Sequence, residues 1–211
     1  MQVARVPFSP FADDFWNQPP RKTIGEQNED TIYLEVGRAL TQWEVVEGFL
    51  GRSFSIFVES ESEAPGRAYG AIASGRSRAS MLAQSSEAFF RKLGGDPNDI
   101  KSNTLLINSY NLAAARRNEI AHGMVVRFID GDINKDHGCL LVSPDYNSLK
   151  THPKYYWENN IRQHTSKYAF NADDIHELSD KFSQLSNKVI GHNLYLSQKY
   201  VVPRKMARSQ P

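Results

Sequence analysis

Cysteine is nearly absent from this chain: its 211 residues include one, Cys139, so no disulfide can form within a single copy. Long apolar runs are missing as well, and none approaches the roughly 20 residues that a membrane-spanning helix needs. The proline-interrupted segment 1–20 lacks the apolar stretch of a secretory signal peptide. Together these absences predict a protein of the reducing cytoplasm that does not enter a membrane.

An excess of charge of one sign is also lacking. Lys and Arg number 25 and Asp and Glu number 24, which leaves a formal net charge of +1. No global field therefore attracts nucleic acid, and any RNA site has to be a local patch. The 40% hydrophobic content is that of an ordinary globular protein, and 211 residues suffice for one domain with a sizeable core.

Familiar metal and nucleotide motifs are missing. There is no Gly-x-Gly-x-x-Gly, no phosphate-binding P-loop and no Cys-x-x-Cys pair. The acidic segment 130–136 superficially resembles a calcium-binding loop, but Leu141 stands where that loop needs a glutamate. His137 and Cys139 have the chemistry of zinc ligands, yet no further ligand lies at the spacing of a structural zinc site. We therefore expect neither a metal nor a cofactor.

What the sequence does contain is helical periodicity. Between residues 30 and 60, apolar side chains recur at alternating spacings of three and four, as on the buried face of a helix. Similar patterns, bounded by glycine, proline or capping residues, mark three further regions. The predicted helices cover residues 30–60, 67–93 with an interruption near Gly75, 96–122 and 173–197. The predicted fold is mainly α, an antiparallel bundle of four main helices.

The pattern changes after Gly123. Two short apolar, β-branched segments separated by turn residues predict a β-hairpin, for which residues 167–170 are a candidate third strand. The remainder, 143–164, is typical of a polar and aromatic loop. The predicted parts are a proline- and aromatic-rich arm (1–27), a helical domain (28–200) whose β-hairpin or small sheet and loop are inserted before the last helix (123–170), and a basic tail (201–211).

Residues 117–123 are the most informative segment, and they close the third predicted helix with the sequence Arg-Asn-Glu-Ile-Ala-His-Gly. Cleavage of a phosphodiester without a metal needs a cation that holds the phosphate and an imidazole that moves protons. Arg117 and His122 supply these two groups. Asn118 lies one turn before His122 on the same helix face, so its amide can hold the imidazole. Gly123 is expected to end the helix as its C′ residue.

This segment, at the end of a penultimate long helix, resembles the signature of the HEPN superfamily (higher eukaryotes and prokaryotes nucleotide-binding). The resemblance implies an all-α domain and, in many members, a metal-independent ribonuclease. It implies that Arg117 and His122 are catalytic and that Asn118 is the polar residue that commonly follows the arginine. Arg116 also fits the permitted spacing to His122 and is a second candidate for binding the phosphate.

The resemblance further implies a homodimer in which two signatures line one cleft and cleave RNA. The RNA 2′-hydroxyl would be the nucleophile, with His122 as base or acid and Arg117 stabilising charge on the phosphate, although water is an alternative nucleophile. Such ribonucleases often act as toxins or anti-phage effectors, sometimes with an antitoxin protein as partner. A non-catalytic module that binds RNA or another protein is the alternative function.

A second group of candidates lies in the insertion. Arg162, His164, Lys167 and Tyr168 follow the aromatic residues 155–157, and aromatic side chains interleaved with cations can stack on bases and hold phosphates. These four residues are candidate contacts to the RNA substrate. The alternative, a loop that packs its aromatic side chains onto the helices, stays open because the spacing has no regular period.

Overall fold

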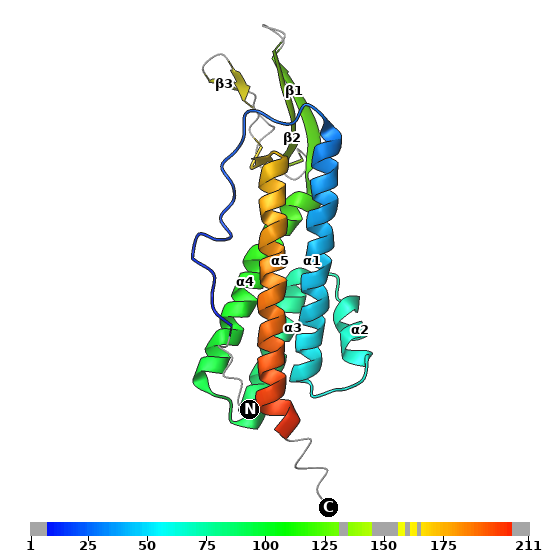
Figure 1. The fold of residues 1–211 in the computed structure, drawn as a ribbon, viewed down its shortest axis with the longest axis vertical. Helices are drawn as coiled ribbons and strands as arrows, with labels where there is room; N and C mark the ends of the chain where they lie inside the picture. Colours follow the sequence, from blue (N-terminus) through cyan, green and yellow to red (C-terminus); the bar gives the residue numbers. More distant parts are fainter. Residues whose placement is uncertain (1–7, 131–134, 145–155, 159–160, 164–165, 204–211) are drawn as a thin grey trace, which may run out of the picture. The chain divides into compact units, whose positions relative to one another are not determined.

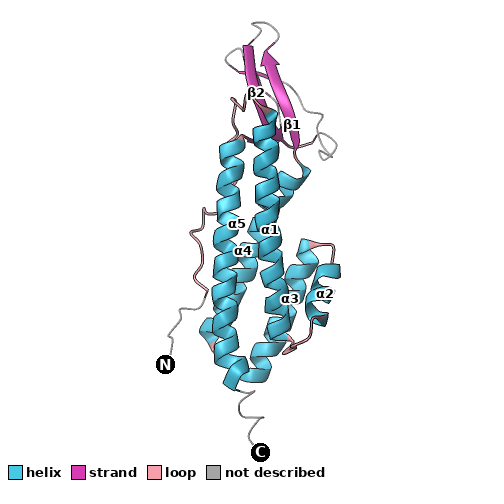
Figure 2. Cartoon of the chain, turned by 45° about the vertical axis from the view of Figure 1, so that its right-hand side comes forward, coloured by secondary structure: helices cyan, strands magenta, loops and turns pink. Residues whose placement is uncertain are grey.

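The computed structural model describes residues 8–130, 135–144, 156–158, 161–163 and 166–203 (Figure 1). Most of these residues are helical, and a small antiparallel sheet precedes the last helix (Figure 2). The predictions of a mainly α fold and of a β insertion before the last helix are therefore confirmed. Arg162 belongs to the described backbone but its side chain does not, and His164 lies outside the described residues.

Four long helices and one short helix form the frame. Their bounds are α1 (Glu29–Phe57), α2 (Ala64–Ala71), α3 (Gly75–Leu93), α4 (Pro97–His122) and α5 (Ala172–Leu196), which continues into a π-helical turn (Ser197–Val201). The interruption expected near Gly75 is the break between α2 and α3. None of the described helices is long and apolar enough to cross a membrane.

Side chains at the helix ends explain these bounds. Ser74 caps α3, with its hydroxyl accepting a hydrogen bond from the Ser77 backbone N–H at 3.3 Å. Gly94 ends α3 in the left-handed conformation, at a φ of 64°, which costs glycine little. At the start of α5, Asn171 and Asp174 each accept a hydrogen bond from the other's backbone N–H. Through this reciprocal arrangement Asn171 caps the helix.

The sheet contains β1 (Met124–Asp130), β2 (Lys135–Val142) and β5 (Ala169–Phe170), in the order β1-β2-β5. All neighbours are antiparallel, and the register of β1 shifts at a bulge between Phe128 and Ile129. The candidate third strand at 167–170 is thereby confirmed. Within the expected loop 143–164, however, β3 (Tyr156–Glu158) and β4 (Ile161–Gln163) pair as a separate two-stranded sheet. Three-residue strands are too short to leave a periodic pattern in the sequence.

The chain divides into two compact units. One contains residues 1–16, 44–114 and 182–211, and the other contains residues 17–43 and 115–181. Helices α1, α4 and α5 each contribute residues to both units. The end of α4, the sheet and the start of α5 belong to the second unit, which therefore holds the signature segment 117–123.

The described residues of the N-terminal arm contact both units of the chain. In the first unit, the Trp16 indole N–H donates to the Ser109 hydroxyl at 2.9 Å, and the indole stacks on Phe182 with ring centres 5.9 Å apart. In the second unit, Glu26 forms a β-bridge with Cys139 of β2, with backbone N–H···O distances of 2.9 and 2.7 Å. The described residues of the arm therefore pack against the chain in both units.

Candidate functional site

The signature residues lie in the last two turns of α4, as the sequence predicted. His122 is the final helical residue and is exposed, Asn118 is exposed, and Arg117 is half-buried. Among the described residues, no side chain forms a hydrogen bond or ion pair with His122. Its imidazole is therefore open to solvent and is not oriented by a neighbour within this part of one chain.

Asn118 contacts the arginine and not the histidine. Its carbonyl oxygen Oδ1 accepts a hydrogen bond from Nη1 of Arg117 at 3.3 Å. The expected hydrogen bond from Asn118 to His122 is not formed within the described part of the chain. Adjacent residues on a helix point about 100° apart, but the long arginine side chain can fold back to the amide beside it.

Arg116 is committed to an ion pair. Its Nη2 lies 2.9 Å from Oε1 of Glu119, and the two side chains are 15% and 18% exposed. The same carboxylate oxygen accepts a hydrogen bond from Nε2 of Gln18 in the N-terminal arm at 3.2 Å. Burial raises the pKa of Glu119 above its usual range, although Arg116 and Gln18 act in the opposite direction. Arg116 would have to leave Glu119 to bind a phosphate.

Unsatisfied polar atoms are concentrated in this segment. Seven buried side-chain nitrogen or oxygen atoms lack a hydrogen-bond partner in the described residues, and three of them fall within residues 116–119. The three are Nε of Arg116, Nε of Arg117 and Oε2 of Glu119. Most buried polar groups in proteins are satisfied, and exceptions tend to mark functional sites, where stability is given up for chemistry. These unsatisfied atoms therefore lie in or next to the segment 117–123 that the sequence pointed to.

The conformation of Gly123 differs from the one expected of a helix-ending C′ glycine. Positive backbone φ angles among described glycines occur at Gly94 and Gly138, so Gly123 does not take the left-handed conformation expected of a C′ residue. A Cβ atom there would lie 2.7 Å from Cγ of Leu141 and 3.0 Å from the Glu119 carbonyl oxygen. The chain passes directly from α4 into β1, and glycine is needed because β2 packs closely against the helix end.

Tyr168 and Lys167 are the described candidates from the insertion. Tyr168 is only 5% exposed, its ring stacks on Phe170 with centres 4.9 Å apart, and its hydroxyl donates to the Glu119 carbonyl at 2.8 Å. Its ring is therefore covered by protein and is not available to stack on a base. Lys167 is exposed, and its backbone N–H donates to the hydroxyl of Ser143 at 3.0 Å. Tyr168 therefore contacts the signature segment through the backbone of Glu119, and not as the exposed RNA contact that the sequence suggested.

A buried carboxylate in the other unit was not predicted from the sequence. Glu47 of α1 accepts hydrogen bonds from the hydroxyls of Tyr69 at 2.6 Å and Tyr110 at 3.0 Å, and Nη1 of Arg78 lies 3.0 Å away. Glu47 follows Val46 within the apolar stripe of α1, and a charge on that face is the signal that could have revealed it. Every group in the cluster is satisfied, which is typical of a structural network.

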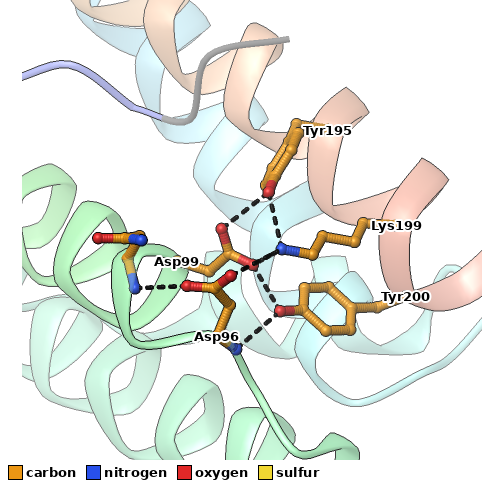
Figure 3. A network of polar contacts seen from close by, with 6 residues as sticks. Asp96, Asp99, Tyr195, Lys199 and Tyr200 are labelled. Atoms are coloured by element: carbon orange, nitrogen blue, oxygen red, sulfur yellow. Dashed lines mark hydrogen bonds and ion pairs between the residues drawn. The ribbon is translucent and has the colours of Figure 1, made fainter. Parts of the chain in front are cut away.

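A second network joins the start of α4 to the end of α5 (Figure 3). The carboxylate of buried Asp99 accepts hydrogen bonds from Tyr195 at 2.9 Å, from Lys199 at 2.7 Å and from Tyr200. Burial alone would raise the pKa of Asp99, but the hydrogen bonds from Lys199, Tyr200 and Tyr195 together hold it below its usual range. The π-helical turn places both Lys199 and Tyr200 within hydrogen-bond distance of this carboxylate. The network therefore holds the two helix ends together.

His192, in the same unit, is expected to make the stability of the fold depend on pH. It is 2% exposed, neither ring nitrogen has a partner among the described residues, and burial lowers its pKa to about 4. Both folded and unfolded states are neutral at this residue above pH 7. As the pH falls through about 6.5, the unfolded state binds a proton that the folded state refuses until about pH 4. Stability is therefore lost on acidification.

We predict that the free energy of unfolding falls by about 3 kcal/mol between pH 7 and pH 4 because of His192. His192→Phe should remove this part of the slope and raise stability at every pH, because it replaces two unpartnered nitrogens with apolar atoms. Urea unfolding at four pH values measures both effects. His176→Gln is the matched control. Hydrogen bonding to Glu35 raises the pKa of His176, so protonation of His176 favours the folded state. Removing this histidine should therefore not reduce the loss of stability between pH 7 and pH 4. An unchanged slope in His192→Phe contradicts the assignment.

Comparisons with protein-family models, with curated proteins and with solved structures found no match. The resemblance to the HEPN superfamily therefore rests on residues 117–123 and on the helical frame that carries them. In the described part of the chain, no group of three or more His, Cys, Asp or Glu side chains is arranged to hold a metal ion.

Proposed function

We propose that this chain is a metal-independent endoribonuclease of the HEPN type, whose catalytic residues are Arg117 and His122. The observation that carries the proposal is the set of three buried, unsatisfied polar atoms within residues 116–119, one turn from an exposed histidine. A half-buried guanidinium with an unpartnered Nε is held in a poorly hydrated place, where its attraction to a phosphate is stronger than in water.

The proposed chemistry uses the substrate's own hydroxyl. An imidazole takes the proton of the RNA 2′-hydroxyl, whose oxygen attacks the adjacent phosphorus, and the bond from phosphorus to the 5′-oxygen breaks. A protonated imidazole gives a proton to that leaving oxygen. The products are a 2′,3′-cyclic phosphate and a 5′-hydroxyl, and Arg117 stabilises the charge on the phosphoryl oxygens. Water as the nucleophile would instead leave no cyclic phosphate.

A homodimer supports this chemistry better than one chain does. Two proton transfers occur in the reaction, and His122 of one chain has no orienting partner among the described residues. A second copy would bring another Arg117 and His122 to a shared cleft. We therefore include a composite, two-fold symmetric site in the proposal, and a toxin or anti-phage role with an antitoxin protein as partner is the setting that the resemblance implies.

The test incubates the purified full chain with a mixed RNA pool in the presence of EDTA. We expect cleavage that EDTA does not reduce, with 2′,3′-cyclic phosphate ends on the 5′ products. Sedimentation at micromolar concentration, in parallel, should show a dimer. Loss of cleavage on adding EDTA, or cleavage by a strictly monomeric chain, would overturn the metal-independent mechanism or the composite site, respectively.

A non-catalytic module that binds RNA or protein is the second candidate. The observation that favours it is the hydrogen bond from Arg117 to Asn118, which engages the amide that was expected to orient His122. A gel-shift assay on the same RNA pool separates the two functions. Binding without any cleavage, at the highest protein concentration used, favours the module.

A further inference from the structure

The last turn of α4 is held from outside the helix at two points along its backbone. The hydroxyl of Tyr168 donates to the carbonyl oxygen of Glu119 at 2.8 Å. Gly123, directly after the helix, packs against Leu141 so closely that a Cβ would lie 2.7 Å from the leucine Cγ. Helix ends fray because their last four carbonyls lack donors inside the helix, and Glu119 supplies the first of these four. These contacts therefore act where the helix would otherwise loosen.

The group that holds the carbonyl is itself rigid. The Tyr168 ring is 5% exposed and is stacked on Phe170 with an interplanar angle of 19°. Phe170 is fully buried and pairs in the sheet with Leu141, the same residue that packs against Gly123. The sheet thus contacts the helix end through Leu141 of β2 and through Tyr168, the residue directly before β5. A tyrosine fixed in this way transmits the position of the sheet to the backbone of α4.

The side chain of Glu119 is held as well. Arg116 of the same helix and Gln18 of the N-terminal arm both contact its Oε1, at 2.9 and 3.2 Å. Backbone and side chain of one residue are therefore anchored to three parts of the chain. By contrast, Asn118 and His122 of the same turns are exposed. The helix end is anchored on one side and open to a substrate on the other.

We propose that Tyr168 is a positioning residue of the candidate site: through the Glu119 carbonyl it sets the direction in which His122 and Arg117 leave the end of α4. The inference rests on the proposed function and adds a residue that lies outside the signature. Tyr168 does not touch the RNA. Its effect is on the geometry of the proton transfer, which is sensitive to small displacements of the imidazole.

Tyr168→Phe removes the hydroxyl and keeps the ring stacked on Phe170. We expect kcat to fall by about three- to tenfold, the size of one lost hydrogen bond, while KM for RNA changes by less than about twofold. Tyr110→Phe is the matched control, because it also removes a buried tyrosine hydroxyl from an oxygen acceptor, in the other compact unit. It should leave kcat unchanged. Equal kcat values in wild type and Tyr168→Phe would overturn the proposal.

Amide hydrogen exchange gives a second measurement that does not need activity. Exchange at Ala121, His122 and Gly123 should be about fivefold faster in Tyr168→Phe than in wild type, and unchanged in Tyr110→Phe. Wild type that does not cleave RNA would remove the proposed function, and exchange then decides whether Tyr168 holds the helix end. Identical exchange in both variants and wild type would show that it does not.

Discussion

His122→Ala and Arg117→Ala are each expected to lower the rate of RNA cleavage by about 10²- to 10⁴-fold without loss of the fold. An oriented acid–base group contributes about this much, and so does a charge that stabilises the transition state. His122 is exposed, so truncating its side chain removes little buried surface. Single-turnover cleavage of one RNA, with circular dichroism as the measure of folding, gives both quantities.

Two exposed residues serve as controls for these variants. His176→Ala removes a histidine from α5, and Arg91→Ala removes an arginine from the last turn of α3. Neither should change the cleavage rate by more than about twofold. Asn118→Ala should be milder than either catalytic variant, because it frees Arg117 from a single hydrogen bond. Full activity in a folded His122→Ala protein rules out the assignment of His122.

Glu47→Ala is expected to lower the free energy of unfolding by about 3–5 kcal/mol, the largest effect on stability that we predict. The change leaves the guanidinium of Arg78 and the hydroxyls of Tyr69 and Tyr110 without their common acceptor. Arg78 is partly exposed and keeps its hydrogen bonds to the Ile72 and Gly70 carbonyls, so the loss comes from its missing charge partner and from the two buried tyrosine hydroxyls. Urea denaturation at pH 7 provides the measurement.

Glu47→Gln separates charge from shape in the same cluster. The amide keeps one carbonyl acceptor, so we expect a smaller loss of about 1–3 kcal/mol. Glu44→Gln, on the exposed side of α1 one turn earlier, is the matched control and should change stability by less than about 0.5 kcal/mol. Glu47→Ala as stable as this control would mean that water or a rearranged Arg78 replaces the carboxylate.

The helices could be predicted because each one has a local cause. Apolar spacing selects the buried face of α1, Gly94 ends α3, and Asn171 caps α5, all within a few residues along the chain. The pairing of β3 with β4 is also local, but three-residue strands leave no periodic pattern, and the Glu47 cluster has no local cause. Tyr69, Arg78 and Tyr110 contact Glu47 across 22 to 63 residues, and sequence spacing carries no information about contacts of that kind.

The position of the candidate residues at the end of a helix was predictable, but their contacts were not. The signature located Arg117 and His122 at the end of α4, because six consecutive residues of a helix have a known geometry. The partners of the side chains differed from those expected. Asn118 binds Arg117 and not His122, and Tyr168 is buried with its hydroxyl on the Glu119 carbonyl. Tyr168 is 49 residues from Glu119, and its aromatic neighbours suggested a surface for RNA instead of a support for the helix.

The bridge between Glu26 and Cys139 limits how far the chain can be shortened from residue 1 without exposing a strand of the sheet. Cys139 lies in β2, and Glu26 covers its backbone N–H and C=O on the side away from β1. A chain shortened past Glu26 would leave this stretch of β2 as an open strand edge, which is a template for association with other chains. Gly25 and Gly138 make the bridge possible, since a Cβ on Gly25 would lie 2.0 Å from the Cys139 carbonyl oxygen. We therefore expect a chain shortened past Glu26 to associate through this edge of β2 more readily than the full chain does.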